Sequence, residues 1–305
     1  MKRQSGDKAE GKKVEETEYS IAEKINGIKE SLNSNFLERK NAVDMIILSV
    51  ISGKHSILIG GPGLAKTAVL KALACSVKGL RFFDFQMTPS TKIEELVSNR
   101  PQNRIGIDNC DIALIDEFFK GPHSTLNSLL SIMNERIIYA PEPHRIPLIS
   151  LFAASNERPD KSSDSNLLPL YDRFLFRMEI LPVKDGKNFR RLLELKEEDF
   201  FNENKTAENF LEKKDIEILS KAAETVDVNA EIFDCLHKIR EELKSKQVFV
   251  SDRRWRETVK ILKTNAALNK RSYVAKEDIK MLEPSLWTYY SDIRAVKNIL
   301  GRELK

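Results

Sequence analysis

The sequence predicts an α/β fold, in which an αβα sandwich built on a parallel sheet is followed by an all-helical domain. Between residues 56 and 180, five short apolar runs alternate with stretches in which apolar residues recur at helical spacing. This alternation is typical of a parallel sheet with helices on both faces. From residue 189 onward, helical patterns continue without a strong strand. A length of 305 residues also exceeds the usual size of one domain, so we expect two folded units.

Changes in composition along the chain indicate where these units begin and end. We expect a disordered tail over residues 1–18 and an αβα domain over residues 19–182. A linker over residues 183–213 should then lead into a helical domain over residues 214–305. The tail contains one large apolar residue, Val14, so burial cannot offset the entropy lost on ordering it. Two stretches of helical spacing, 21–32 and 43–50, should form helices before the first strand.

Composition and charge argue against several classes of protein. The chain has 50 Lys and Arg against 46 Asp and Glu, and a net charge of +4 is too balanced to indicate nucleic-acid binding. The longest apolar runs are shorter than a membrane span, and the N-terminus lacks the apolar segment of a secretory signal. We therefore expect no membrane span and a cytoplasmic location.

A phosphate-binding loop is predicted directly after the first apolar run. Its eight residues are Gly60, Gly61, Pro62, Gly63, Leu64, Ala65, Lys66 and Thr67. Glycines let the backbone curl so that its N–H groups face the phosphates of ATP, and the following helix adds positive potential. Lys66 should reach the β- and γ-phosphates, and the Thr67 hydroxyl should bind Mg²⁺. Ala65 stands where the usual pattern has glycine, which is tolerable if its backbone already has helical angles. The residues alone also allow a glycine-rich turn before a structural helix.

Two later strands end in polar residues that suit nucleotide hydrolysis. In the run DIALIDE, Asp116 should hold Mg²⁺ through water and Glu117 should orient and polarise the attacking water. Asn156 ends the run ISLFAASN, and the carboxyl ends of parallel strands line the ligand crevice, so it should lie beside the γ-phosphate. Taken alone, the acidic pair could be a solvated loop and the asparagine a turn. The upstream loop favours the catalytic interpretation.

Four runs of the sequence resemble those of a known protein family. From about residue 20 to about residue 290 it is similar to the MoxR-type AAA+ ATPases, closest to their regulatory-ATPase-variant branch, through GGPGLAKT, IALIDEFFKGPHSTLNSLLSIMNER, FAASNERP and LLPLYDRFLFR. Members typically share the alanine before the loop lysine. The resemblance implies Mg²⁺-dependent ATP hydrolysis in a ring of six copies, with ATP at each interface. It further implies remodelling or maturation of protein clients, often with a partner that contains a von Willebrand factor A domain.

The resemblance also assigns two arginines and a hairpin. Arg173 matches the arginine finger that reaches the neighbouring subunit's nucleotide, and Arg253 matches the sensor-2 arginine with which the helical lid binds nucleotide. Residues 137–148 match the hairpin before the strand that ends at Asn156. From the residues alone, Arg173 could instead form a weak surface ion pair. Arg177 and Arg254 remain alternatives for the finger and the sensor.

Two other functions remain open from the sequence. One is a DNA-directed AAA+ motor of helicase type, because such modules share the hairpin. Against it, the hairpin region has Arg136, His144 and Arg145 together with Glu142, and no basic stripe of the kind that binds DNA. The other is a nucleotide-gated switch that binds ATP with little turnover. The presence of Glu117 and Arg173 argues against the switch.

Overall fold

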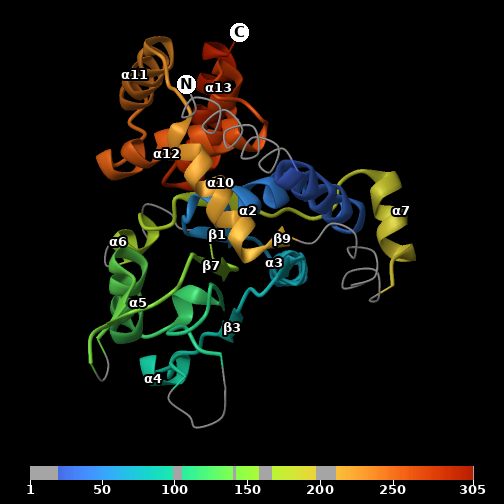
Figure 1. The fold of residues 1–305 in the computed structure, drawn as a ribbon, viewed down its shortest axis with the longest axis vertical. Helices are drawn as coiled ribbons and strands as arrows, with labels where there is room; N and C mark the ends of the chain where they lie inside the picture. The colour runs from blue at the N-terminus through green and yellow to red at the C-terminus, as the bar shows by residue number, and fades with distance from the viewer. Residues whose placement is uncertain (1–19, 99–104, 140–141, 158–166, 197–210, 305) are drawn as a thin grey trace, which may run out of the picture.

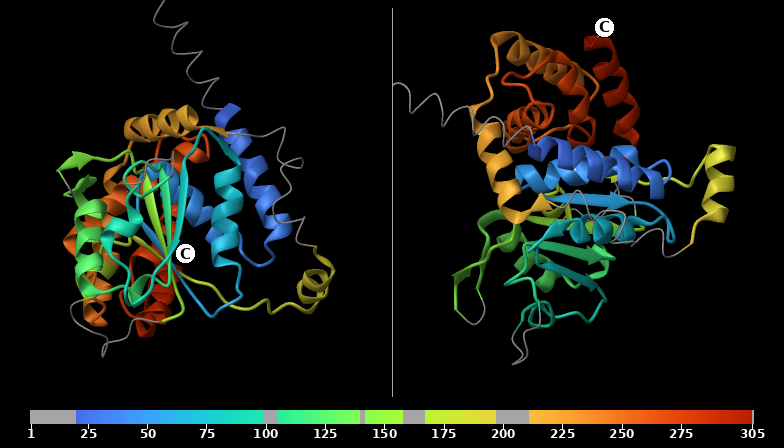
Figure 2. Two further views of the ribbon diagram at one scale, coloured as in Figure 1. Left: turned by 90° about the horizontal axis from the view of Figure 1, so that it is seen from below. Right: turned by 45° about the vertical axis from the view of Figure 1, so that its right-hand side comes forward.

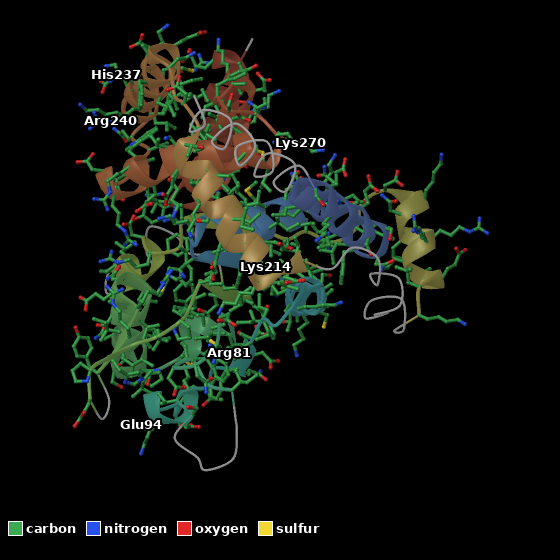
Figure 3. All side chains as sticks on the ribbon, viewed as in Figure 1. Arg81, Glu94, Lys214, His237, Arg240 and Lys270 are labelled. Atoms are coloured by element: carbon green, nitrogen blue, oxygen red, sulfur yellow. The ribbon has the colours of Figure 1, made fainter. Side chains whose placement is uncertain are left out.

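The computed structural model describes residues 20–98, 105–139, 142–157, 167–196 and 211–304. The tail expected over residues 1–18 lies outside the described residues. The rest forms an αβα domain and a helical lid, which lie at opposite ends of the long axis in Figure 1. Figure 3 places Arg240, on the lid, at one end and Glu94, on the αβα domain, at the other.

A five-stranded parallel sheet forms the centre of the αβα domain, as the sequence predicts. Its strands, in spatial order, are β3 (Phe82–Gln86), β4 (Ile112–Asp116), β7 (Ser150–Ser155), β1 (Ser56–Ile59) and β8 (Phe176–Glu179). Every neighbouring pair is parallel. The central strands β4, β7 and β1 are buried along almost their whole length, because helices cover both faces. All five carboxyl ends therefore meet at one edge of the sheet.

Helices cover both faces of this sheet, with α5 on one side and α3 on the other in Figure 2. The main helices of the domain are 20–35, α2 (Lys40–Ser52), α3 (Lys66–Cys75) and α5 (His123–Glu135). The shorter elements are β2 (Val77–Lys78), α4 (Ile93–Leu96), η1 (Phe118–Lys120), β5 (Ile137–Ile138), β6 (His144–Arg145) and α6 (Leu168–Tyr171). Strands β5 and β6 pair antiparallel, which confirms the predicted hairpin.

The lid is helical, with one difference from the prediction. Its helices are α10 (Lys213–Thr225), α11 (Ala230–Ser245), α12 (Asp252–Leu268), η3 (Lys276–Ser285), η4 (Tyr290–Asp292) and α13 (Ile293–Glu303). One of the helical patterns after residue 189 forms a 3₁₀ helix, η3, and Pro284 within it lacks the N–H that an α-helix would use. Helices α10 and α12 pack on α2, so the lid rests on the αβα domain.

The expected linker contains two further elements. Helix α7 (Gly186–Glu194) stands apart from the body of the molecule in Figure 1, and β9 (Leu211–Glu212) pairs with β2. Among the described residues, no helix is both long enough and apolar enough to cross a membrane.

Candidate active site

The loop between β1 and α3 has two positions that need glycine for different reasons. A Cβ on Gly60 would overlap the carbonyl oxygen of Ile180, at the end of the neighbouring strand β8. Gly63 has φ +73°, in the left-handed region that L-residues rarely adopt. The amide of Gly60 donates to the Ser155 carbonyl at 3.0 Å, which joins the loop to the end of β7. The loop is therefore held against both neighbouring strands.

Ala65 adopts a conformation that differs from the expectation. Its φ of 61° and ψ of 22° place it in the left-handed region, so the condition of helical angles, under which a Cβ is readily tolerated, is not met. The Cβ of an L-residue in this region costs about 1–2 kcal/mol because it approaches the following carbonyl oxygen. Backbone strain is thus held directly before Lys66, the first residue of α3.

Lys66 is buried at the centre of the loop. Its ammonium donates to the carbonyls of Gly60 and Gly61, at 2.7 and 2.8 Å, and to Asn156 Oδ1 at 2.9 Å. Burial lowers the pKa of Lys66, and the nearby carboxylates of Asp116 and Glu117 oppose that shift. A lysine ammonium has three hydrogens, so all of its donors are engaged. A phosphate oxygen would have to replace one of these acceptors.

Thr67 and Asp116 bring two hard oxygen ligands together. Thr67 Oγ1 donates to Asp116 Oδ2 at 3.2 Å, across the gap between α3 and β4. The other carboxylate oxygen, Oδ1, accepts from the amide of Glu117 at 2.8 Å, which fixes the orientation of the group. Hydroxyl and carboxylate oxygens are the donors that Mg²⁺ prefers. These two residues therefore fit a magnesium ion bound beside the loop.

Glu117 begins the turn after β4, and both of its carboxylate oxygens have partners. Asn156 Nδ2 donates to Oε1 at 2.7 Å, and Lys120 Nζ lies 3.3 Å from Oε2. The Glu117 backbone is left-handed, with φ 52°, and Phe118 after it is fully buried. The short helix η1 thus places Glu117 and Lys120 on the same side.

The amide of Asn156 links the two halves of the site. Its Oδ1 accepts from Lys66, while its Nδ2 donates to Glu117. The structure therefore brings together five residues that the sequence predicts at one edge of the sheet: Lys66, Thr67, Asp116, Glu117 and Asn156. Lys120 was missed, although it lies three residues after Glu117 in the DEFFK run.

Arg173 and Arg253 lie elsewhere, together at the opposite edge of the sheet. Arg173 precedes β8, whose first bond joins the Leu175 amide to the carbonyl of His55, just before β1. The five steps along the chain from His55 to Gly60 span about 16 Å at strand geometry. Arg173 and Arg253 line one cavity of about 360 Å³, with His55 in its wall. Burial and the charge of Arg173 lower the pKa of Arg253. Neither arginine is placed at the phosphate-binding loop of its own chain.

Two other arginines, considered as alternatives, are structural. Arg177 is 1% exposed and donates to the carbonyls of Trp287 and Tyr171, at 2.6 and 3.1 Å. Arg254 is also 1% exposed; it donates to the Trp287 carbonyl at 3.1 Å and lies 3.1 Å from Asp172. Both join the αβα domain to the lid. Most of their donors are therefore used within the junction.

Arg173 and Arg253 differ from these two in exposure, because their side chains are only half-buried and line a cavity. Arg173 Nε and Arg253 Nη1 are buried without a hydrogen-bond partner within the described residues, as are Arg177 Nε and Arg254 Nε. Buried donors of this kind are uncommon in folded proteins, because leaving one unpaired costs free energy. The two side chains are therefore suited to an acceptor from outside the chain.

The hairpin region is less basic than its sequence suggests. Arg136 points inward, where it donates to the carbonyls of Gly53 and Ile149, at 3.1 and 2.9 Å. It ends α5 and fixes that helix to the segment before β1. The exposed basic side chains of the hairpin, among the described residues, are His144 and Arg145.

A second cavity, of about 290 Å³, was not predicted. It lies between α2, the end of β8 and the lid, and its walls include Arg39, Asn41, Ile180, Leu181 and Trp287. Ile180 is the residue whose carbonyl touches Gly60. Ile180 is therefore the residue between the cavity and the loop, whose own residues do not line it, and only the tertiary packing of three distant segments reveals the cavity.

Comparison with known proteins assigns the family. Residues 23–221 match the family model described as the MoxR domain in the MoxR-vWA-beta-propeller ternary systems, and residues 231–300 match an AAA lid domain. The chain belongs to the MoxR family of AAA+ ATPases. As a MoxR-type AAA+ protein it is an ATPase with the α/β fold and helical lid described above. Neither match assigns it to the regulatory-ATPase-variant branch, which remains a prediction.

Proteins similar in sequence to this chain occur in archaea and bacteria. Two uncharacterized proteins of Methanocaldococcus jannaschii are each 33% identical, over 92% and 85% of this chain and 74% and 70% of their own lengths. The uncharacterized protein YeaC of Bacillus subtilis is 25% identical over 84% of this chain and 82% of its own. The crystal structure of a candidate ATPase from Cytophaga hutchinsonii superposes with a TM-score of 0.76, covering 97% of both chains at 20% identity. That likeness supports the fold alone.

Proposed function

We propose that this MoxR-type ATPase hydrolyses ATP with Mg²⁺ at the edge where β1, β4 and β7 end. The observation that supports this most directly is the Asn156 amide, which bonds to both Lys66 and Glu117. This amide links Lys66, which is expected to bind the phosphates, to Glu117, which is expected to orient the attacking water. The magnesium ion would be held by Thr67 and Asp116 and would neutralise charge on the β- and γ-phosphates.

The residues of the site have separate parts in hydrolysis. Lys66 binds the phosphate oxygens, and the loop amides hold the β-phosphate. Glu117 orients a water whose oxygen attacks the γ-phosphorus, and it accepts the proton that this water loses. The bond from the γ-phosphorus to the bridging oxygen breaks, which leaves ADP and phosphate. The cavity of about 290 Å³, separated from Gly60 by Ile180, would hold the base and ribose.

A second copy of the chain would complete the site. Arg173 and Arg253 lie at the opposite edge of the sheet, with buried donors that lack partners within the described residues. Arginine suits phosphate oxygens because it presents several fixed donors and stays charged. In a ring, expected to be a hexamer, this edge of one subunit faces the loop edge of the next. Both arginines would then act on the neighbour's nucleotide.

The test of this function compares Lys66→Ala with Glu117→Gln. Lys66→Ala should abolish ATP binding, because it removes the counter-charge of the phosphates from a partly dehydrated loop. Glu117→Gln should bind ATP as the wild type does but stall before hydrolysis. Fluorescent-nucleotide titration and phosphate release measure the two properties separately. Equal loss of ATP binding in both variants would make Glu117 structural and contradict the proposed site.

We further propose that hydrolysis drives remodelling or maturation of protein clients together with a von Willebrand factor A domain partner. Support comes from the matched family model, whose description pairs the MoxR domain with vWA and β-propeller proteins. Glu117→Gln, locked with ATP, should retain such a partner in affinity capture, whereas Lys66→Ala should not. Equal recovery of that partner by both variants would contradict nucleotide-dependent engagement.

The alternative of a DNA-directed motor has less support once Arg136 is seen to point inward. His144 and Arg145, with Glu142 beside them, make a small cationic surface. A gel shift with single-stranded DNA tests this alternative, and salt-sensitive retardation would favour it.

Phosphate release by the wild type at a rate well above that of Glu117→Gln would exclude a switch that only binds ATP.

A further inference from the structure

We propose that Lys120 is a positioning residue for hydrolysis, which holds the Glu117 carboxylate while Asn156 engages the nucleotide. The inference rests on the proposed role of Glu117. Lys120 Nζ lies 3.3 Å from Glu117 Oε2, and Asn156 occupies the other oxygen at 2.7 Å. The two partners differ in one respect: Asn156 is also bonded to Lys66, whereas Lys120 lies outside that network.

To bind Lys66, a phosphate oxygen of ATP must displace one of the groups that accept a hydrogen bond from its ammonium. The three hydrogens of its ammonium already point to Gly60 O, Gly61 O and Asn156 Oδ1. Two of these acceptors are backbone carbonyls, fixed by the loop, and Asn156 is the one side chain among them. A phosphate oxygen therefore replaces Asn156 at the least conformational cost. When Asn156 turns toward the phosphate, Glu117 Oε1 loses its donor.

Lys120 is placed to keep Glu117 oriented after that change. The two residues bracket η1, where the Lys120 amide donates to the Glu117 carbonyl at 2.9 Å. Between them Phe118 is fully buried and packs edge-on against Phe119 and Phe174, with ring centroids 5.3 and 5.1 Å apart. The backbone that separates the carboxylate from the ammonium is thus rigid. An ion pair on such a turn fixes the direction of the carboxylate without binding the nucleotide.

The surface position of Lys120 makes the inference testable. Its side chain is 48% exposed, and an exposed ion pair contributes little to the stability of a fold. Small displacements of a catalytic group, however, have large effects on rate. Removing the ammonium should therefore affect turnover and leave folding and ATP affinity unchanged.

The test compares Lys120→Met, Lys120→Arg and the control Lys71→Met. Lys71, on α3, is 40% exposed and forms an ion pair with Asp84 at 2.5 Å, away from Glu117. Lys120→Met should lower kcat by about tenfold with an unchanged ATP Kd, because it misplaces the base only in the reaction step. Lys120→Arg keeps the charge and should recover most of the rate. Lys71→Met should match the wild type.

A second readout does not depend on turnover. ADP with aluminium fluoride imitates the transition state with its oriented water, whereas ADP with beryllium fluoride imitates bound ATP. Lys120→Met should weaken the aluminium fluoride complex by about tenfold and leave the beryllium fluoride complex unchanged. An unchanged or raised kcat for Lys120→Met, or equal weakening of both complexes, would overturn the inference. If Glu117→Gln itself hydrolyses ATP at the wild-type rate, the proposed function fails instead.

Discussion

At the scale of single residues, most of the site follows from sequence, and the exceptions have physical causes. Lys66, Asp116 and Asn156 could be predicted because each follows a buried strand, and a parallel sheet brings the ends of its strands to one edge. The ion pair of Lys120 could not, because its partner depends on how η1 turns. The left-handed backbone of Ala65 was also missed, since local propensity favours the helix that starts one residue later.

The strain at Ala65 leads to a prediction about stability. Ala65→Gly removes the strain of the left-handed backbone, which costs the folded state about 1–2 kcal/mol. It also makes the unfolded chain more flexible, which favours unfolding by about 0.5–1 kcal/mol. We expect a net gain of roughly 0.5–1 kcal/mol in unfolding free energy, measured by urea denaturation. Ala68→Gly, inside α3, is the matched control and should instead lose about 1 kcal/mol. A loss at both positions would contradict the left-handed conformation of Ala65.

At the scale of elements, the strands and most helices could be predicted from the spacing of apolar residues. What spacing could not reveal is how the lid is attached. Arg177 and Arg254 are both buried and both donate to the carbonyl of Trp287, in the lid. A charged residue is normally assigned to the surface, and Trp287 lies 110 positions after Arg177 in the chain. Their burial depends on long-range packing and on carbonyls left unpaired where η3 ends.

This junction leads to a prediction about Arg254. Arg254→Ala removes the donor from several buried carbonyls and from Asp172, and breaking a buried charge network costs about 3–5 kcal/mol. We expect a loss of that order in unfolding free energy. Arg256→Ala, two residues along the same helix and 80% exposed on its side chain, should change it by less than about 0.5 kcal/mol. Similar small losses for both variants, measured by urea denaturation, would show that Arg254 does not hold the junction.

At the scale of the whole molecule, the chemistry is divided between two edges of one sheet. The loop, Asp116, Glu117 and Asn156 lie where the strands end, whereas Arg173 and Arg253 lie where they begin, beside the lid. Resemblance to the family implied a role for both arginines at a nucleotide, but the sequence could not show that they lie together. The structure of one chain places the two edges apart, and we propose that they meet at an ATP between two copies. Assembly of several copies is thus the step that would join them.

The central claim is that two subunits share one active site, and mixing two inactive variants tests it most directly. Arg173→Ala should bind ATP normally but hydrolyse it as much as about a thousandfold more slowly, by analogy with other arginine fingers. Lys66→Ala should not bind ATP. In mixed rings, the Arg173→Ala subunit keeps its loop and Glu117, and a Lys66→Ala neighbour supplies Arg173, so some interfaces hold a complete site. Phosphate release, followed against the mixing ratio with size-exclusion chromatography to demonstrate mixed rings, should then rise well above that of either variant alone. Turnover that stays at background while mixed rings are present would contradict the shared site.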